Sequence, residues 1–321
     1  MSAQKFLITG FSGFVSRHFC EYLERNEIHA FIKGVDLKNH DFTFDDFKNI
    51  SVDFEKIDLL SESDTKKLLS TFKPNFILHL ASYSSVALSW KDPVTSFNNN
   101  TNIFLNILEA SRKLKIDTRI LSIGSSEEYG NIRESDLPLG EDHPLHPLSP
   151  YAVARVSQEL LSKVYVESYG LDIVLTRSFN HIGPYQKDIF VIASFAKQLA
   201  KIKKGNSLDG NLVAGDVSII RDFLDVRDVV AAYYSLMHNG KKGEVYNVCS
   251  GKGVSLKEVA LIMADILKVK INIIIDERLI RPNDIKKIIG SNTKIKQSLG
   301  WKPKLSLKQS LHDILNYWDS G

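Results

Sequence analysis

This chain of 321 residues has few cysteines and no large excess of either charge. The two cysteines, Cys20 and Cys249, are too few for a disulfide framework or a four-ligand zinc site, and we expect no metal. Lysine and arginine total 41 against 38 aspartate and glutamate. The resulting net charge of +3 lacks the basic surplus that indicates nucleic-acid binding.

Long apolar runs are also missing. No stretch approaches the ~18 apolar residues that a membrane helix needs. An apolar strand begins a few residues after Met1, so we expect no signal peptide. A hydrophobic fraction of 43% with 25% charged residues is ordinary for a globular protein. These absences leave a soluble, cytoplasmic α/β protein with no membrane partner as the expectation.

Short apolar segments alternate with amphipathic ones through the first 180 residues. Strands that alternate with helices predict a parallel sheet covered by helices on both faces, which is a Rossmann-type doubly wound α/β fold. The expected strands are 6–8, 29–35, 51–57, 76–80, 119–123 and 172–176; the expected helices are one ending near residue 24, then 61–72 with Ser61 as N-cap, 94–114 and 151–168.

The pattern becomes irregular after residue 180. We expect residues 1–180 plus about 225–250 to form a dinucleotide-binding domain. About 181–224 plus 251–321 would form a smaller, interleaved α/β substrate domain. The segment from 126 to 151 is expected to be a long loop, and long ordered loops are usually functional. Later expected elements are helices 190–203, 225–237, 255–268 and 306–318, strands 245–248 and 271–275, a loop at 181–189, and a glycine-rich section at 205–215.

A glycine-bearing turn directly follows the first strand and opens a helix. Gly10, Gly13 and Ser16 match the spacing G-x-x-G-x-x-G, except that serine takes the third position. Glycines there let the backbone approach a pyrophosphate at the helix N-terminus. We predict that Gly10, Gly13, Phe14 and Val15 bind a dinucleotide; the alternative is a simple glycine turn without a ligand.

The ends of the next strands complete the predicted cofactor site. An acid about twenty residues beyond the glycines usually binds the adenosine ribose and favours NAD, while a basic group favours NADP. Asp36 favours NADH and Lys33 favours NADPH, so the sequence leaves the choice of cofactor open. A third possibility is that these residues are only a charged strand end without a ligand. The remaining predicted cofactor-binding residues are Asp58 and Leu59, which could meet the adenine edge, and Leu80 and Ala81.

Three polar side chains converge on a catalytic hypothesis. Ser125 follows a strand, at the carboxyl end where open α/β sheets place ligands. Tyr151 and Arg155 are four residues apart near a helix start, and therefore share one face. A phenol is a poor proton donor near neutral pH unless a cation stabilises its phenolate. The pattern suits hydride chemistry at an alcohol or ketone carbon. Considered separately, Tyr151 and Arg155 could be a pair on the protein surface, and Ser125-Ser126 could be a simple turn.

The chain resembles the extended short-chain dehydrogenase/reductase family over essentially its whole length, and within it the reductases of GDP-4-keto-6-deoxy-D-mannose. The segments that carry the resemblance are 124–130 (GSSEEYG), 149–151 (SPY), 176–184 (TRSFNHIGP), 195–198 (FAKQ), 221–228 (RDFLDVRD), 245–251 (VYNVCSG), 279–282 (LIRP) and 300–301 (GW).

The resemblance implies catalytic roles for Ser125 and Tyr151, with Arg155 where the family has lysine. That lysine holds the nicotinamide ribose and lowers the tyrosine pKa, and arginine is not an interchangeable point charge. Glu127 is catalytic in related 4,6-dehydratases, and the reductases carry it too. The segment after Asp222 is similar to reductases. The implied activity is therefore NAD(P)H-dependent reduction at C4 of a GDP-4-keto-6-deoxy hexose or heptose.

The resemblance also implies a substrate site and a homodimer. Asp216 stands where the reductases commonly have asparagine, and the dimer would pair helices 94–114 and 151–168. Apolar Val153, Val156, Leu160, Leu161 and Val164 could serve the core or that interface. The residues expected to bind the GDP-linked keto sugar are Ser126, Asn180, Lys197, Arg221 and Arg281.

Several alternatives stay open at this point. Arg221-Asp222 and Arg227-Asp228 could be structural ion pairs instead of ligands. The enzyme could be a nucleotide-sugar dehydratase or epimerase. Because Arg155 replaces a lysine, the chain could also be a non-catalytic relative that keeps the cofactor fold.

Overall fold

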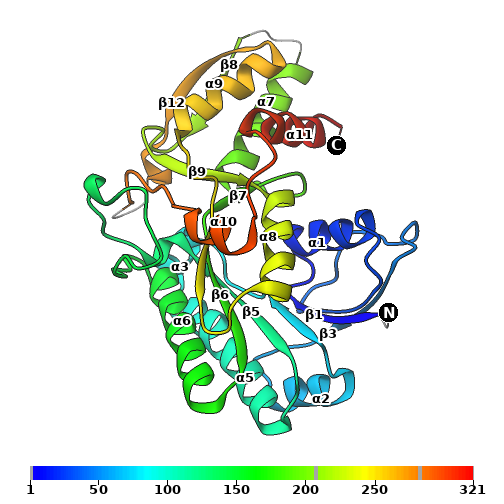
Figure 1. Ribbon diagram of the computed structural model, residues 1–321. Coiled ribbons are helices and arrows are strands. Elements are labelled where there is room, and N and C mark those ends of the chain that lie inside the picture. Colours follow the sequence, from blue (N-terminus) through cyan, green and yellow to red (C-terminus); the bar gives the residue numbers. More distant parts are fainter. Residues whose placement is uncertain (1–2, 206–208, 281–283, 321) are drawn as a thin grey trace.

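The computed structural model describes residues 3–205, 209–280 and 284–320, which form two lobes (Figure 1). The larger lobe contains a seven-stranded sheet of order β10-β6-β5-β4-β1-β2-β3, with all neighbours parallel. The predicted doubly wound parallel sheet is therefore confirmed. Its strands are β1 Gln4–Thr9, β2 Ala30–Asp36, β3 Ile50–Lys56, β4 Phe76–His79, β5 Arg119–Ser125, β6 Asp172–Ser178 and β10 Val245–Val248.

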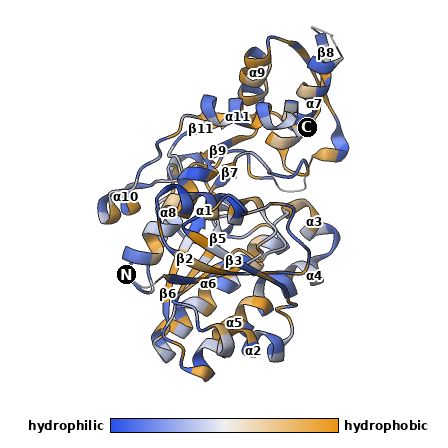
Figure 2. Cartoon of the chain, turned by 90° about the vertical axis from the view of Figure 1, so that its right-hand side faces the viewer, coloured by the Kyte–Doolittle hydropathy of each residue, from blue (hydrophilic) through white to orange (hydrophobic). Residues whose placement is uncertain are grey.

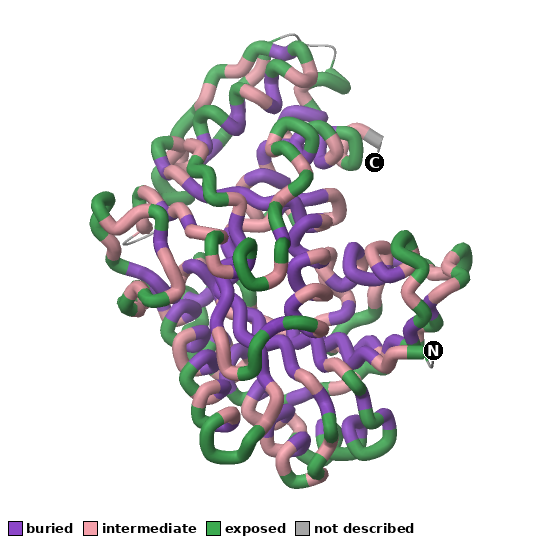
Figure 3. The backbone as a smooth tube through the Cα atoms, in the orientation of Figure 1, coloured by how far each residue is buried: buried purple, intermediate pink, exposed green. Residues whose placement is uncertain are grey.

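Helices cover both faces of this sheet because successive strand side chains point to opposite sides. On β1, Phe6 and Ile8 join one hydrophobic cluster, and Leu7 joins the other. The apolar strands cross the middle of the lobe (Figure 2), where the backbone is mostly buried (Figure 3). The first cluster includes side chains of α1 Phe14–Arg25 and α8 Val226–Asn239; the second includes those of α2 Glu62–Phe72, α5 Ile103–Leu114 and α6 Pro150–Tyr169.

The strand order reverses between β1 and β4. The chain passes from β1 outward through β2 and β3, and then returns to place β4 on the other side of β1. Loops that follow β1 and β4 therefore diverge at one end of the sheet and leave a crevice there. In open α/β sheets this is the place where ligands bind.

The smaller lobe has a core of its own. A two-stranded parallel sheet of β8 Asp209–Ala214 and β12 Lys270–Ile275 packs with three helices around a cluster that includes Phe195, Met263 and Leu311. These helices are α7 Val191–Lys204, α9 Leu256–Leu267 and α11 Leu307–Ser320. A three-stranded sheet of β7 Asn180–Ile182, β9 Ile220–Asp225 and β11 Gly253–Ser255 lies at the junction of the lobes (Figure 1).

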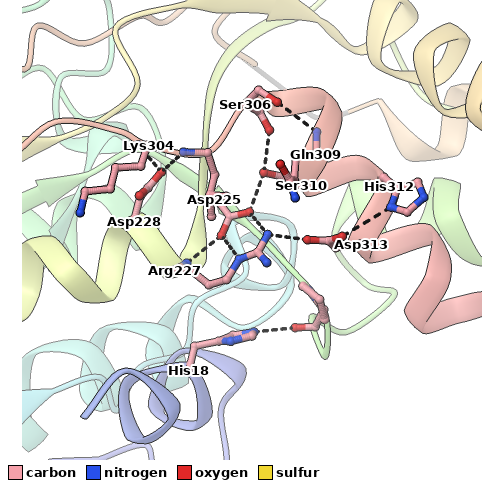
Figure 4. A network of polar contacts seen from close by, with 12 residues as sticks. His18, Asp225, Arg227, Asp228, Lys304, Ser306, Gln309, Ser310, His312 and Asp313 are labelled. Atoms are coloured by element: carbon pink, nitrogen blue, oxygen red, sulfur yellow. Dashed lines mark hydrogen bonds and ion pairs between the residues drawn. The ribbon is translucent and has the colours of Figure 1, made fainter. Parts of the chain in front are cut away.

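Charged side chains at the start of α8 fix α11 to the junction (Figure 4). Buried Asp225 accepts hydrogen bonds from Arg227 Nε at 2.8 Å and from Ser310 Oγ at 2.6 Å, and Arg227 also pairs with Asp313 at 2.7 Å. Asp228 accepts two backbone N–H bonds from residues 304 and 305, each 2.9 Å long. Arg227 therefore pairs with Asp225 and Asp313, and the alternative that paired it with Asp228 is wrong.

The long helix expected over 94–114 is interrupted. It consists of α4 Pro93–Phe97, a π-helical turn at Asn98–Asn102, and then α5. Asn100 within the turn is fully buried, and its side chain accepts a 3.0 Å bond from Tyr83 N and donates a 2.8 Å bond to Ser96 O. The wider turn therefore tethers the loop after β4, and π-bulges often mark functional positions.

Most other elements match the expectations. Strand β10 does rejoin the large sheet beside β6, Ser61 caps α2, and 126–149 is a loop with short 3-10 turns. The sequence pattern missed β8 in the glycine-rich section, β7, β9 and β11, and the short helices α3 Val86–Lys91 and α10 Thr293–Leu299. Within the described ranges, no helix combines the length and apolar character required to traverse a bilayer.

Candidate active site

The turn between β1 and α1 leaves a helix N-terminus open to a ligand. Gly10 has a φ of +69°, and a Cβ there would lie 2.7 Å from Ala81 N, so only glycine fits beside the loop after β4. Gly13 is the N-cap of α1 and provides no side chain to bond the first N–H groups. Free N–H groups at a helix N-terminus favour a phosphate.

Ser16 occupies the third position of the motif, where a glycine is usual, without disturbing the turn. Its side chain is fully buried, and its hydroxyl donates to the carbonyl groups of Phe11 and Gly13. The serine therefore satisfies its own polar group within the turn. The departure from the glycine motif is compatible with close packing of α1 on the sheet.

Asp36 lies beside this turn but is occupied by the protein itself. Its Oδ2 accepts bonds from Ser12 N at 3.0 Å and Ser12 Oγ at 2.6 Å, and its Oδ1 accepts bonds from Leu37 N at 2.7 Å and Lys38 N at 3.3 Å. Lys33 points elsewhere and pairs with carboxylates on β3. The opposing signals in the sequence therefore separate: only Asp36 contacts the glycine turn.

The other predicted cofactor residues line the neighbouring strand ends. Asp58 accepts a 2.9 Å bond from Leu60 N, which fixes the loop after β3, and Leu59 is buried. Leu80 and Ala81 follow β4, and Ala81 N donates a 3.1 Å bond to Thr9 Oγ1. These contacts hold the loops of β1, β3 and β4 around the crevice.

Ser125 ends β5 and begins the turn η2, Ser126–Glu128. Its hydroxyl accepts a 3.2 Å bond from Glu127 N, and its own N–H donates a 2.6 Å bond to Glu128 Oε1. Ser125 and Ser126 are both buried, and Glu127 is half-buried on the same turn. The Ser-Ser pair does form a turn, as the alternative held, and this turn lies at the carboxyl end of the sheet.

Tyr151 and Arg155 form a buried pair on α6. Arg155 Nε donates to Tyr151 Oη at 3.2 Å, and only 7% of Tyr151 and 4% of Arg155 is exposed. The predicted shared face is confirmed, and the alternative of a surface pair is wrong. Helix α6 packs on β5 and η2, which brings this pair to the strand end that carries Ser125.

The predicted substrate residues are dispersed around the junction of the lobes. Asn180 begins β7, and Lys197 on α7 pairs with Asp188 at 2.6 Å. Asp216 pairs with Lys286 at 2.5 Å, and the side-chain hydrogen bonds lower the pKa of Asp216 to about 2. Arg281 lies outside the described residues.

Arg221 is held by the protein. It is 5% exposed, pairs with Asp284 at 2.7 Å and donates a 2.6 Å bond to Ile285 O. Arg221 does form an ion pair, as the alternative predicted, but its partner is Asp284 and not Asp222. Asp222 instead accepts hydrogen bonds from the N–H groups of Ser250 and Gly251.

Sequence reasoning missed two side chains beside the catalytic pair. Gln158 is 1% exposed and its Oε1 accepts a 2.6 Å bond from Arg155 Nη1. Glu128 is fully buried; burial and then the charge of Glu159 raise its pKa to about 8. The spacing of three from Arg155 could have pointed to Gln158.

This arrangement defines the class of protein. A dinucleotide crevice at the strand reversal and a buried tyrosine beside a cation are features of short-chain dehydrogenases/reductases, and the comparisons agree. A family model described as GDP-mannose 4,6 dehydratase matches residues 7–314, so the chain belongs to that family, within the extended short-chain dehydrogenases/reductases. The resemblance seen in the sequence is confirmed.

Individual relatives span the whole chain. GDP-6-deoxy-D-mannose reductase of Pseudomonas aeruginosa is 36% identical over 99% of this chain and 98% of its own length. GDP-mannose 4,6 dehydratase 1 of Arabidopsis thaliana is 29% identical over 94% of this chain and 86% of its own length.

Solved structures share the fold over its full length. RMD from Pseudomonas aeruginosa, complexed with NADPH, has a TM-score of 0.85 at 34% identity and covers 99% of both chains. The UDP-glucose 4-epimerase of Thermotoga maritima with UDP-glucose has a TM-score of 0.86 at 26% identity, again over 99% of both.

Proposed function

We propose that this protein reduces the C4 keto group of a GDP-4-keto-6-deoxy sugar, a hexose or a heptose, with NADPH or NADH. The observation that carries the proposal is the buried Tyr151–Arg155 hydrogen bond at the end of β5. A buried phenol held by a cation is an acid suited to protonating a developing alkoxide. The similarity to a GDP-6-deoxy-D-mannose reductase supports the choice of substrate.

The crevice fits a dinucleotide on the evidence of its own residues. Gly10 lets the glycine turn approach the backbone of Ala81 closely, and Gly13 places no side-chain cap on the N–H groups at the start of α1, which suits a pyrophosphate there. Phe14 and Val15 begin that helix, and Asp58, Leu59 and Leu80 flank the adenosine end. When bound, a reduced nicotinamide supplies the hydride for C4.

Each catalytic side chain has a separate task. Tyr151 donates its proton to the C4 oxygen, which becomes the hydroxyl of the product. Ser125 hydrogen-bonds the same oxygen and orients it. Arg155 stabilises the phenolate that remains on Tyr151. Glu127 lies on the turn after Ser125 and contacts the sugar.

The nucleotide sugar occupies the junction of the lobes. Ser126, Asn180 and Lys197 contact the substrate there. Arg221 is already bound to Asp284 and shapes the site through the 284–287 segment. The residue division given above, 1–180 plus about 225–250 against about 181–224 plus 251–321, assigns cofactor and substrate to the two lobes. The separate hydrophobic clusters of the lobes support two units, but Ile295 and Trp301, which the division gives to the substrate domain, belong to the cluster of the larger lobe.

The direct test mixes purified protein with GDP-4-keto-6-deoxymannose and reduced cofactor. We expect stoichiometric loss of nicotinamide absorbance and a GDP-6-deoxy sugar as product. Tyr151→Phe should lower kcat at least about 100-fold, since it removes the proton donor, whereas Tyr169→Phe at the exposed end of the same helix should not. Turnover without net cofactor consumption would indicate a dehydratase or an epimerase and would refute the proposal. No turnover at all would favour the non-catalytic relative.

We propose that two copies pair through α4 and α6. Both helices leave large apolar side chains in solvent, and α4 packs against α6. Leu160→Glu places a charge on the exposed side of α6, and we expect light scattering to show a monomer. A mass equal to that of the wild type would refute the proposed dimer. The exposed apolar residues are Val94, Phe97, Val153, Leu160 and Val164, which range from 39% to 69% exposed.

We also place the protein in the cytoplasm, in contact with neither nucleic acid nor membrane. Its two cysteines, Cys20 and Cys249, are both free and buried, which fits a reducing compartment. The near-neutral charge supports a small anionic ligand over a nucleic acid.

A further inference from the structure

The Arg155 guanidinium is held at several points deep in the larger lobe. Besides the bond from Nε to Tyr151, its Nη1 donates to Ile123 O at 2.9 Å and to Gln158 Oε1 at 2.6 Å. The small gap between α6, β5 and β6 that these groups line, which is distinct from the cofactor crevice, is too narrow for a water molecule. Protein groups alone therefore fix the orientation of this cation.

The carboxamide of Gln158 connects that cation to strand β5. Its Nε2 donates to Ser122 Oγ at 2.9 Å and to Ile123 O at 3.1 Å, while its Oε1 faces Arg155. Partners on both sides determine which end of the amide is oxygen. Gln158 thus fills the gap between α6 and β5 with its hydrogen bonds satisfied.

Gln158 is also electrically neutral, so it does not neutralise the charge of Arg155. In the part of the chain that the structure describes, Arg155 is 4% exposed and forms no ion pair with a carboxylate; the neighbouring Glu159 pairs with Lys163 and Arg177 instead. A carboxylate in the place of Gln158 would hold the guanidinium equally well and neutralise it. The amide holds the guanidinium and leaves its charge for the Tyr151 oxygen.

We propose that Gln158 is a positioning residue for catalysis, which orients the Arg155 guanidinium toward Tyr151 without neutralising its charge. The proposal rests on the proposed role of Tyr151 as proton donor. It accounts for the presence of arginine at this position, since the longer, forked head reaches Tyr151, Ile123 O and Gln158 together. A lysine nitrogen is a single point and cannot reproduce this geometry.

Titratable groups on three further elements face this pair. His79 on β4 is buried; burial and then the charge of Arg155 lower its pKa to about 3, so it stays neutral. Glu128 on η2 has its pKa raised by burial to about 8, against an opposing effect of Arg155. On α8, burial raises the pKa of Tyr233, whose hydroxyl lies 2.7 Å from Ser178 Oγ. A pH profile of the site must therefore be compared with that of Glu128→Gln.

Two substitutions separate orientation from charge. Gln158→Met removes the acceptor, and Gln158→Glu keeps an acceptor while neutralising Arg155. We expect both to lower kcat at about pH 7 by roughly tenfold, to change KM less than about threefold, and to alter the alkaline limb of the kcat profile. Ser162→Ala removes a neighbouring buried hydroxyl that does not touch Arg155, and serves as the structural control.

A substrate-free readout keeps this test independent of the proposed activity. The ultraviolet tyrosinate absorbance of each variant, minus that of the same variant carrying Tyr151→Phe, follows the ionisation of Tyr151 alone. We expect the Gln158 variants to require a higher pH for this signal, and Ser162→Ala to match the wild type. If Gln158→Met and Gln158→Glu titrate as the wild type does, the inference is wrong, whether or not the enzyme reduces the sugar.

A double-mutant cycle tests the route of the effect. In an Arg155→Lys background, Gln158→Met should change kcat less than about twofold, because the group that Gln158 positions is gone. A tenfold loss in that background would show that Gln158 acts without Arg155 and would overturn the inference. A shifted tyrosinate signal with no turnover of any GDP-4-keto sugar would instead refute the proposed function and leave the inference standing.

Discussion

Asp36 and Ser12 are joined by two hydrogen bonds, both to Asp36 Oδ2: one from the Ser12 hydroxyl at 2.6 Å and one from its N–H at 3.0 Å. With Leu37 N and Lys38 N on Oδ1, all the usual acceptor positions of this carboxylate are in use. The acid at the end of β2 therefore holds the glycine turn in place.

Asp36→Asn tests this structural role. An amide cannot accept all four bonds, so the turn loosens for either cofactor. We expect the affinities for NADH and NADPH to fall together, with their ratio changing less than about threefold, by fluorescence titration. A loss of about tenfold confined to NADH would instead make Asp36 the ligand of the ribose hydroxyls.

Ser16→Gly would restore the usual glycine motif, and we expect it to weaken the fold. The substitution removes the hydroxyl, whose single proton is shared between Phe11 O and Gly13 O, and adds backbone freedom within α1, for an expected loss of roughly 1–2 kcal/mol in urea unfolding. Ser16→Ala separates the hydroxyl from the backbone effect. An unchanged or higher stability of Ser16→Gly would show that the hydroxyl contributes nothing.

Arg155→Lys restores the residue typical of the family, yet we expect it to destabilise this protein. Gln158 Oε1 loses its donor and Ile123 O loses one of its two, at a buried position, for roughly 1–3 kcal/mol. Chemical unfolding of the two proteins measures the difference. A variant that is more stable and also faster would indicate that Arg155 is a degenerate position.

Glu128 makes stability depend on pH. In the unfolded chain its carboxyl ionises near 4.5, whereas in the folded protein burial and then Glu159 raise the pKa to about 8. The stability that this group contributes is therefore complete below about pH 4.5 and is lost as pH rises to about 8. Part of this cost reflects Glu128 Oε2, which has no hydrogen-bond partner among the described residues.

Glu128→Gln should remove this dependence. Between about pH 5 and about pH 8.5 we expect the unfolding free energy of the wild type to fall by roughly 1–3 kcal/mol relative to that of the variant. Glu167→Gln, an exposed carboxylate on α6, is the matched control and should follow the wild type. Parallel curves for Glu128→Gln and the wild type would contradict the assignment of a neutral buried acid.

The sequence predicted those features that depend on local pattern. The strand–helix alternation, the glycine turn and the spacing of Tyr151 and Arg155 are readable because each is encoded within a few residues. Bonds between distant segments are not. Arg221 and Asp284 are 63 positions apart, and Ser122 and Gln158 are 36 apart, so their pairing follows only from the folded topology.

The interrupted helix illustrates a second limit. The apolar periodicity of 94–114 predicts one continuous helix, but the bonds of Asn100 to Ser96 and to the loop at Tyr83 favour a π-helical turn. A tertiary contact thus overrides local propensity. Short elements such as β11 are set in the same way, by the strand beside them.

Transfer of a labelled hydride tests the central claim most directly. The protein would be incubated with GDP-4-keto-6-deoxymannose and NADPH carrying deuterium at C4 of the nicotinamide, with each face labelled in turn. A reductase transfers deuterium from one of the two labelled cofactors to C4 of the sugar, with one oxidised cofactor formed per product, as read by NMR and mass spectrometry. A product without deuterium, or with deuterium at another carbon, would contradict the account.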